Sequence, residues 1–320
     1  MPAVYAADPT KLPRIAPVGA GAIDRPVVTV VDASKMLEGA GFEVRRAFVG
    51  VDLSLVDPFL LLDHLGAVEY APGEAKGAPD HPHRGFETVT YMMDGELEHR
   101  DSNGGGGLIT DGATQWMTAG AGIVHSEMPT EQIVTKGGLF HGVQLWVNLP
   151  KVQKWTPAEY QELEADQVAL IASDDAGAFV RLIAGDLGDH QGPGRTRTPI
   201  TYGHVTVSPG ARLQLPWRPE FNALVYVLAG RGAVGPERRP IVAGQMAVLG
   251  GGEFVTIVGE AKQDSHSPAL EALVLGGRPI REQVAWHGPF VMNTREEIFQ
   301  AIEDYHAGRM GSIPAKRAGE

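Results

Sequence analysis

Two pairs of side chains in the sequence have the types and spacing of metal ligands. His81 and His83 are separated by one proline in HPHRGF, and His125 and Glu127 are separated by one serine in VHSEMP. Residues i and i+2 of a β-strand point to the same face, so each pair can present both side chains to one ion. If the two strands are neighbours inside a barrel, three imidazoles and one carboxylate converge. The spacing therefore predicts a metal site of three histidines and a carboxylate.

A second carboxylate competes for the fourth ligand position. Glu87 has the same strand parity as His81 and His83, so spacing alone leaves Glu87 and Glu127 as alternatives. A donor set of this kind, without a thiolate, suits Fe(II) and also accepts Mn, Ni, Cu or Zn. Four protein ligands leave up to two positions of an octahedral ion for a substrate and O₂. Open positions indicate chemistry rather than a purely structural metal.

Other polar residues are interpreted as scaffold. His64 and His141 lie in apolar runs, which is typical of hydrogen-bonded core or pocket-lining histidines, and His99 on a return strand is expected to face solvent. The NGGGG segment at 103–107 lacks the Lys-Ser/Thr ending of a phosphate loop and is interpreted as a hairpin turn. Gln115 stands beside Trp and Met and is left out of the site, because such a cluster more often belongs to the core.

The composition is that of a globular protein rich in turns. The chain has 320 residues, of which 41 are Gly and 23 are Pro, and this excess without a collagen period favours a short-stranded all-β fold. Cysteine is absent, which excludes disulfides and thiolate metal sites. The net charge of -12 argues against direct nucleic-acid binding. Without an apolar leader or a run of roughly 18 to 20 apolar residues, we expect a cytoplasmic protein with no membrane contact.

A weak internal repeat predicts two related β modules. ETVTYMMDG at 87–95 aligns without gaps on NALVYVLAG at 222–230, and GATQWMTAG at 112–120 aligns less well on GQMAVLGGG at 244–252. In these registers the four candidate ligands have non-ligating counterparts, which are Pro216, Arg218, Ile257 and Gly259. The histidines are therefore not needed to form the module.

The pattern along the chain predicts two domains and a terminal helix. We expect an N-terminal metal-binding domain at 1–155, a polar linker at 156–177 and a C-terminal domain without ligands at 178–320. NTREEIFQAIEDYHAG at 293–308 is the clearest helix, with Asn293 or Thr294 as its N-cap and Gly308 at its end. The sequence thus predicts an all-β protein with a C-terminal helix.

Several longer motifs resemble the pirin family of the cupin superfamily. They are HPHRGFETVTY, DGATQWMTAGAGIVHSEMP, GVQLWVNLP and GPFVMNTREEI, and the resemblance extends from about Val51 to Gly311. It implies a bicupin fold of two β-barrel or jelly-roll domains. It also implies one metal, usually iron, in the N-terminal barrel and a degenerate C-terminal barrel. In this family the metal ligands correspond to His81, His83, His125 and Glu127, which selects Glu127 over Glu87.

The resemblance also implies an activity. Many pirins are similar to quercetin 2,3-dioxygenases, which predicts a dioxygenase that cleaves quercetin or a similar flavonol or enol with O₂. The substrate hydroxyl would bind the metal, and Glu127 would take its proton as the catalytic base. The alternative is a non-enzymatic metal-dependent regulator that acts as a transcriptional cofactor or binds a metabolic enzyme as its protein partner. A storage or structural cupin is a third interpretation.

Overall fold

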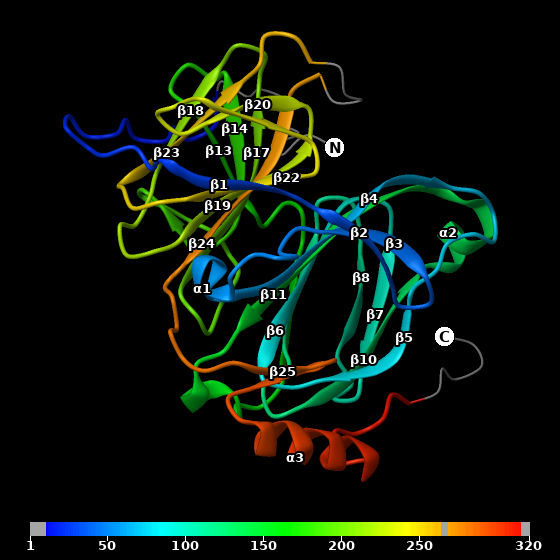
Figure 1. Cartoon of the computed structure of the whole chain (residues 1–320). Coiled ribbons are helices and arrows are strands. Elements are labelled where there is room, and N and C mark those ends of the chain that lie inside the picture. Colours follow the sequence, from blue (N-terminus) through cyan, green and yellow to red (C-terminus); the bar gives the residue numbers. More distant parts are fainter. Residues whose placement is uncertain (1–10, 264–267, 315–320) are drawn as a thin grey trace. The chain divides into compact units, whose positions relative to one another are not determined.

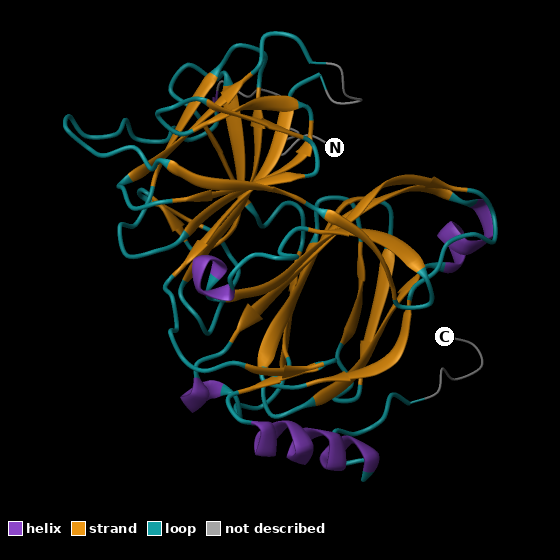
Figure 2. Cartoon of the chain, in the orientation of Figure 1, coloured by secondary structure: helices purple, strands orange, loops and turns teal. Residues whose placement is uncertain are grey.

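The computed structural model describes residues 11–263 and 268–314. Strands dominate the chain and helices are few and short, which confirms the predicted all-β class (Figure 2). Among the described residues, no helix is both long enough and apolar enough to span a bilayer.

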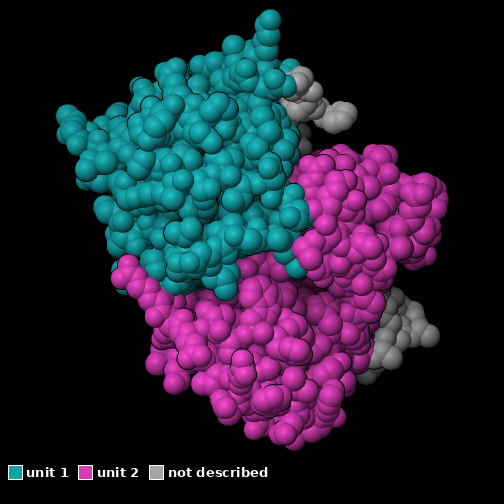
Figure 3. All heavy atoms as spheres, in the orientation of Figure 1, with its two compact units in different colours: residues 1–34, 46–59, 166–279 teal, residues 35–45, 60–165, 280–320 magenta. Residues whose placement is uncertain are grey.

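The chain divides into two compact units that are interleaved along the sequence (Figure 3). Unit 1 consists of residues 1–34, 46–59 and 166–279, and unit 2 consists of residues 35–45, 60–165 and 280–320. The domains expected from the sequence were contiguous, whereas each of these units is assembled from three segments. An N-terminal segment joins the unit built mainly from the second half of the chain, and the C-terminal segment joins the other unit.

Unit 2 contains two antiparallel sheets (Figure 1). The larger sheet has the order β12 (Glu159–Leu163), β9 (Thr114–Thr118), β6 (Phe86–Asp94), β11 (Gly138–Asn148), β4 (Phe59–Tyr70), β3 (Phe42–Arg46) and β2 (Ser34–Glu38). The smaller sheet has the order β5 (Ala78–His83), β10 (Ile123–Pro129), β7 (Leu97–Asp101) and β8 (Gly106–Ile109). Side chains of the two sheets meet between them, because Thr90 of β6 donates a hydrogen bond to Glu127 of β10.

Unit 1 repeats this arrangement. Its larger sheet has the order β1 (Val27–Asp32), β22 (Gln245–Leu249), β19 (Ala223–Ala229), β24 (Leu270–Gly277), β17 (Ile200–Val207), β14 (Ala178–Ala184) and β13 (Ala169–Ala172). Its smaller sheet has the order β18 (Arg212–Pro216), β23 (Phe254–Gly259), β20 (Arg231–Val234) and β21 (Arg239–Val242), and β15 (Asp186–Leu187) pairs with β16 (His190–Gln191). The interior of unit 1 is filled by a large apolar cluster, to which Leu215, Val225 and Ile257 belong.

The repeat seen in the sequence matches the topology of the sheets. The segment at 87–95 forms β6 and its counterpart at 222–230 forms β19, and each is a central strand of its larger sheet. The second pair of segments forms β9 and β22, which are the neighbours of those central strands on the same side. The expected linker at 156–177 contains two strands, because β12 pairs with β9 and β13 pairs with β14.

The described part of the chain also contains short helical segments, of which the last is the predicted helix. They are α1 (Leu53–Val56), α2 (Glu131–Lys136), the 3-10 turn η2 (Lys151–Gln153) and α3 (Arg295–His306). Thr294 is the N-cap of α3 and forms a capping box with Glu297. The hairpin β25 (Ala285–His287) and β26 (Phe290–Met292) precedes α3, and the apolar face of α3 packs on this hairpin.

Candidate metal centre

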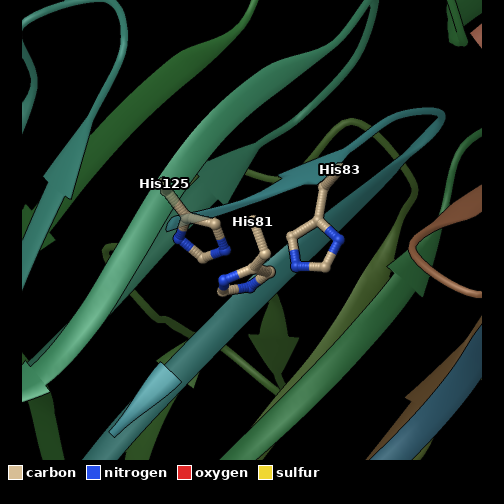
Figure 4. Close-up of side chains that lie close together, drawn as sticks. All are labelled: His81, His83 and His125. Carbon is tan, nitrogen blue, oxygen red and sulfur yellow. The ribbon is translucent and has the colours of Figure 1, made fainter. Parts of the chain in front are cut away.

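The structure brings three predicted ligands together. Strands β5 and β10 are antiparallel neighbours with His81 opposite His125, so one interstrand pair contributes two imidazoles and His83 adds the third. Figure 4 shows the three rings turned toward one another. The ring centroids of His81 and His125 are 4.3 Å apart, and those of His83 and His125 are 4.9 Å apart. One nitrogen of each ring lies within 4.8 Å of the others, a spacing that can hold a metal ion.

Glu127 lies next to these three histidines, and His125 stands between its carboxylate and the rings of His81 and His83. Its carboxylate groups with His125 and His99, with the possible ligand atoms within 4.8 Å of one another. Both carboxylate oxygens are held: Thr90 Oγ1 donates to Oε1 at 2.7 Å and Gln144 Nε2 donates to Oε2 at 2.8 Å. The carboxylate is therefore fixed inside unit 2, and each oxygen keeps a further lone pair for another partner.

Glu87 occupies the opposite face of the sheet. It lies opposite Thr118, whose hydroxyl donates to Oε1 of Glu87 at 2.8 Å, whereas Thr90 on the other face of β6 contacts Glu127. The parity argument that made Glu87 a candidate is wrong, because the strand is interrupted at Gly85, which has φ +91°. A Cβ at this position would lie 2.0 Å from the carbonyl oxygen of Val291, so only glycine fits the turn.

The hydrogen bonds of the histidines suit metal binding. Nδ1 of His81 is 2.7 Å from the carbonyl oxygen of Pro79, and Nδ1 of His83 is 3.3 Å from that of Pro289. A carbonyl oxygen only accepts, so each Nδ1 carries the proton and each Nε2 keeps its lone pair for a metal. Nε2 of His125 is buried and has no hydrogen-bond partner in the described part of the chain. A buried ring nitrogen without a hydrogen-bond partner, close to the rings of His81 and His83, is expected where a bond to a metal would form.

Burial keeps two of these rings, those of His83 and His125, neutral. The pKa of His83 lies well below its ordinary value, chiefly because the ring is buried and also because His81 is close. The pKa of His125 is lowered in the same way, by burial first and then by its histidine neighbours. Neutral imidazole is the form that binds metals. The three rings thus fit a divalent cation in position and tautomer, and the two buried ones, His83 and His125, also in charge.

Aromatic side chains form one wall of the centre. The ring centroid of Trp146 is 5.0 Å from that of His83 and 4.3 Å from that of Phe86. Trp286 of β25 follows at 5.9 Å from Trp146 and is 39% exposed. This wall combines apolar contact area with an indole N–H of Trp146 that is buried without a partner among the described residues.

His99, expected to face solvent, is completely buried and lies at the centre. It is exposed to 0%, its ring stacks on Tyr160 with centroids 5.0 Å apart, and Gln115 lies 2.8 Å from its Nδ1. Burial acts to raise the pKa of Asp101, but the nearby His99 ring and backbone hydrogen bonds from Asn103 and Gly105 outweigh it and lower that pKa. The prediction failed because β7 was assumed to turn its polar residues outward, whereas His99 and Asp101 are buried and alternate with less buried residues.

His64 and His141 are not part of this centre. Their Nε2 atoms are 2.8 Å apart and both side chains are buried, which confirms that they are hydrogen-bonded core histidines. His141 lies beyond a β-bulge of β11, opposite Asp94 at the end of β6, and belongs to neither of the two potential ligand clusters of the described residues. In the described part of unit 1, no cluster of potential metal ligands is found.

Comparisons with known proteins agree with this architecture. A family model described as pirin matches residues 41–147, and one described as the pirin C-terminal cupin domain matches residues 202–311. A pirin-like protein of Arabidopsis thaliana is 42% identical over 299 residues, which are 91% of this chain and 92% of the relative. The chain belongs to the pirin family. Pirin of Homo sapiens is 39% identical over 87% of this chain and 91% of its own length.

A solved structure extends the pirin match to the whole fold. The crystal structure of quercetin 2,3-dioxygenase from Acinetobacter baumannii superposes with a TM-score of 0.83 at 36% identity, covering 91% of this chain and all of the other. The predicted pair of cupin domains with a C-terminal helix is thereby confirmed.

Proposed function

We propose that this pirin-family protein binds one divalent metal through His81, His83, His125 and Glu127 and cleaves a flavonol or related enol with O₂. The observation that carries the proposal is the set of three converging imidazoles, two of them buried and His81 partly exposed, whose Nε2 atoms are left for a metal. Nitrogen and oxygen donors without thiolate favour Fe(II), with Mn, Ni, Cu or Zn as other occupants. When bound, the metal would act as a Lewis acid toward the substrate oxygen and supply the redox chemistry with O₂.

The chain's own residues supply the proton acceptor. Glu127 is held by donors from Thr90 and Gln144, which fix its carboxylate beside His125. In this position it takes the proton of an enolic hydroxyl that approaches the three histidines. The two donors restrict the carboxylate to one orientation, so the base is positioned before the substrate arrives.

The aromatic wall supports a planar substrate. Phe86 and Trp146 lie beside His83, so a flat ring bound at the centre would contact apolar surface rather than water. The similarity to the solved structure of a quercetin 2,3-dioxygenase, at 36% identity, is in line with a flavonol as substrate. A cytoplasmic location stays a prediction.

The test is turnover by a defined metal form. Protein freed of metal and reloaded anaerobically with Fe(II) should consume quercetin and O₂ when both are added, followed by absorbance and an oxygen electrode. His81→Ala should lose bound iron and turnover together, and Glu127→Gln should lose turnover. Iron retained in full by His81→Ala would contradict the site. Absence of turnover with every first-row metal would contradict the enzyme and favour a metal-dependent regulator.

A further inference from the structure

The buried His99 connects the metal centre to a fixed carboxylate. Asp101 accepts backbone hydrogen bonds at Oδ1 from the N–H groups of Asn103 and Gly105, at 2.7 and 3.0 Å. A Cβ on Gly105 would lie 2.3 Å from Oδ2 of Asp101, so the glycine-rich turn allows this close approach. Oδ2 in turn lies 3.5 Å from Nε2 of His99, a buried nitrogen that forms no regular hydrogen bond with the described residues. The turn thus holds a carboxylate against one nitrogen of the buried ring.

This contact determines which nitrogen of His99 carries the proton. A carboxylate this close attracts an N–H and repels a lone pair, so Nε2 of His99 carries the hydrogen and Nδ1 of the neutral ring is an acceptor. The amide nitrogen of Gln115 lies 2.8 Å from this Nδ1 and donates to it, which leaves Oε1 of Gln115 as the buried atom without a partner among the described residues. Neither nitrogen of His99 therefore offers a free lone pair to a metal, although the ring lies beside two candidate ligands.

Nδ1 of His99 also faces His125, the third candidate ligand. Nδ1 of His125 lies 3.3 Å from Nδ1 of His99, whose single lone pair is therefore shared by two donors, Gln115 at 2.8 Å and, at the longer distance, His125. His125 then carries its proton on Nδ1 and keeps its own lone pair on Nε2. That lone pair is the one turned to His81 and His83. In His81 and His83 a backbone carbonyl sets the tautomer, whereas in His125 a side chain sets it.

We propose that His99, oriented by Asp101, is a positioning residue that sets the tautomer of His125 and thereby the metal affinity of the centre. The inference rests on the metal site of the proposed function but not on the identity of the reaction. Outer hydrogen-bond partners of this kind typically change metal affinity about 10- to 100-fold when they are altered.

Asp101→Asn is the discriminating variant. The side-chain amide oxygen of the new asparagine still accepts from the N–H groups of Asn103 and Gly105. Its NH₂ group then points toward Nε2 of His99. His99 must then accept at Nε2 and carry its proton on Nδ1, so it can no longer accept from His125. Asp111→Asn is the matched control, because Asp111 also accepts a backbone N–H in a turn, from Gly95 at 2.8 Å, and the charge change is identical.

Two measurements on the full-length protein decide the proposal. Zn(II) affinity is measured by competition with a chelator, and the ring tautomers are read from long-range ¹H–¹⁵N spectra of ¹⁵N-histidine protein. We expect about 10- to 100-fold weaker Zn(II) binding and a reversed His99 tautomer in Asp101→Asn, and neither change in Asp111→Asn. His99→Asn, whose amide oxygen can replace Nδ1 as acceptor, should bind Zn(II) more tightly than His99→Leu.

The outcomes separate this proposal from the proposed function. Unchanged Zn(II) affinity in Asp101→Asn would overturn the positioning role, and so would weaker binding with an unaltered His99 tautomer, because that pattern indicates only a structural effect. Equal loss in His99→Asn and His99→Leu would also overturn it. A wild-type protein that binds no Zn(II) would remove the metal site itself. Tight binding without turnover would contradict the dioxygenase and leave the positioning role intact.

Discussion

Replacing Asp304 by Asn should destabilise the protein strongly, because it removes the counter-charge of a buried arginine. Arg84 directly follows the ligand His83, and its Nη1 donates to Oδ2 of Asp304 at 2.7 Å. The side chains are only 4% and 11% exposed. Nε of Arg84 donates to the carbonyl oxygen of Ala121 at 2.6 Å, so the guanidinium is fixed between the metal-binding segment and helix α3.

Two lines of reasoning give the magnitude. Burial acts to raise the pKa of Asp304, but hydrogen bonds from Arg84, Arg309 and Gln300 outweigh it and hold the pKa at about 2. Against an ordinary value of 3.8, this corresponds to about 2 kcal/mol in favour of the charged form. Removing one partner of a buried ion pair costs about 3 to 5 kcal/mol. We therefore expect Asp304→Asn to lower the free energy of unfolding by about 2 to 4 kcal/mol.

Urea titration at pH 7, followed by circular dichroism, measures this loss. Glu303→Gln is the control, because it removes the same charge from the exposed neighbouring position of α3. Replacing both partners, as in Arg84→Met with Asp304→Leu, should recover part of the stability, since no charge is then left buried without a partner. The pKa of Asp304 is lowered by folding, so its contribution is complete above about pH 4 and is lost as the pH falls toward 2. A loss in Asp304→Asn no larger than that in Glu303→Gln would refute the reasoning.

Three further predictions concern other buried polar groups. Lys154 is buried with three acceptors around Nζ, and burial lowers its pKa to about 7. Unfolding therefore takes up a proton between pH 7 and about 10, so the free energy of unfolding should rise with pH in this range. Urea titration should show a rise of at most about 1.4 kcal/mol per pH unit in the wild type and a smaller rise in Lys154→Met. The pKa of His64 is lowered by burial and by His141 and Arg45, so stability should fall as the pH drops below about 6.5. His64→Asn should weaken this acid dependence, and equal slopes in both proteins would contradict it. Glu87→Gln should leave Zn(II) affinity unchanged because its carboxylate lies on the opposite face of the sheet; weaker binding in the chelator assay would return Glu87 to the ligand set.

The candidate site follows from the sequence as far as strand periodicity holds. The alternation within β5 and within β10 correctly places His81, His83 and His125 together, because each pair lies in one continuous strand. The same alternation fails between His83 and Glu87, where Gly85 with its positive φ starts a new strand. A single glycine in a strand-like run was the available signal for this break.

Other features lie beyond periodicity because they depend on pairing over long distances. His99 becomes part of the centre only when β7 pairs with β10, which places it opposite Glu127. The interleaving of the two units has the same origin, since β1 pairs with β22 more than two hundred residues away. Neither pairing can be read from the local composition. The N-cap of α3 is a local feature, and Thr294 is one of the two residues, Asn293 or Thr294, that the sequence offered for it.

The two units show what distinguishes a scaffold from a site in this protein. They share strand order, and in the registers of the repeat the inward positions change from polar in unit 2 to apolar in unit 1. The pairs are Thr90 and Val225, Gln115 and Ala247, and His125 and Ile257. Apolar residues close the interior of unit 1, whereas in unit 2 polar atoms such as Nε2 of His125 and Nε1 of Trp146 are buried without a partner in the described chain. Burying such groups is unfavourable unless a partner satisfies them. Since the repeat also forms with apolar residues at these positions, the fold alone does not require the polar interior of unit 2, which is in line with the proposed metal site.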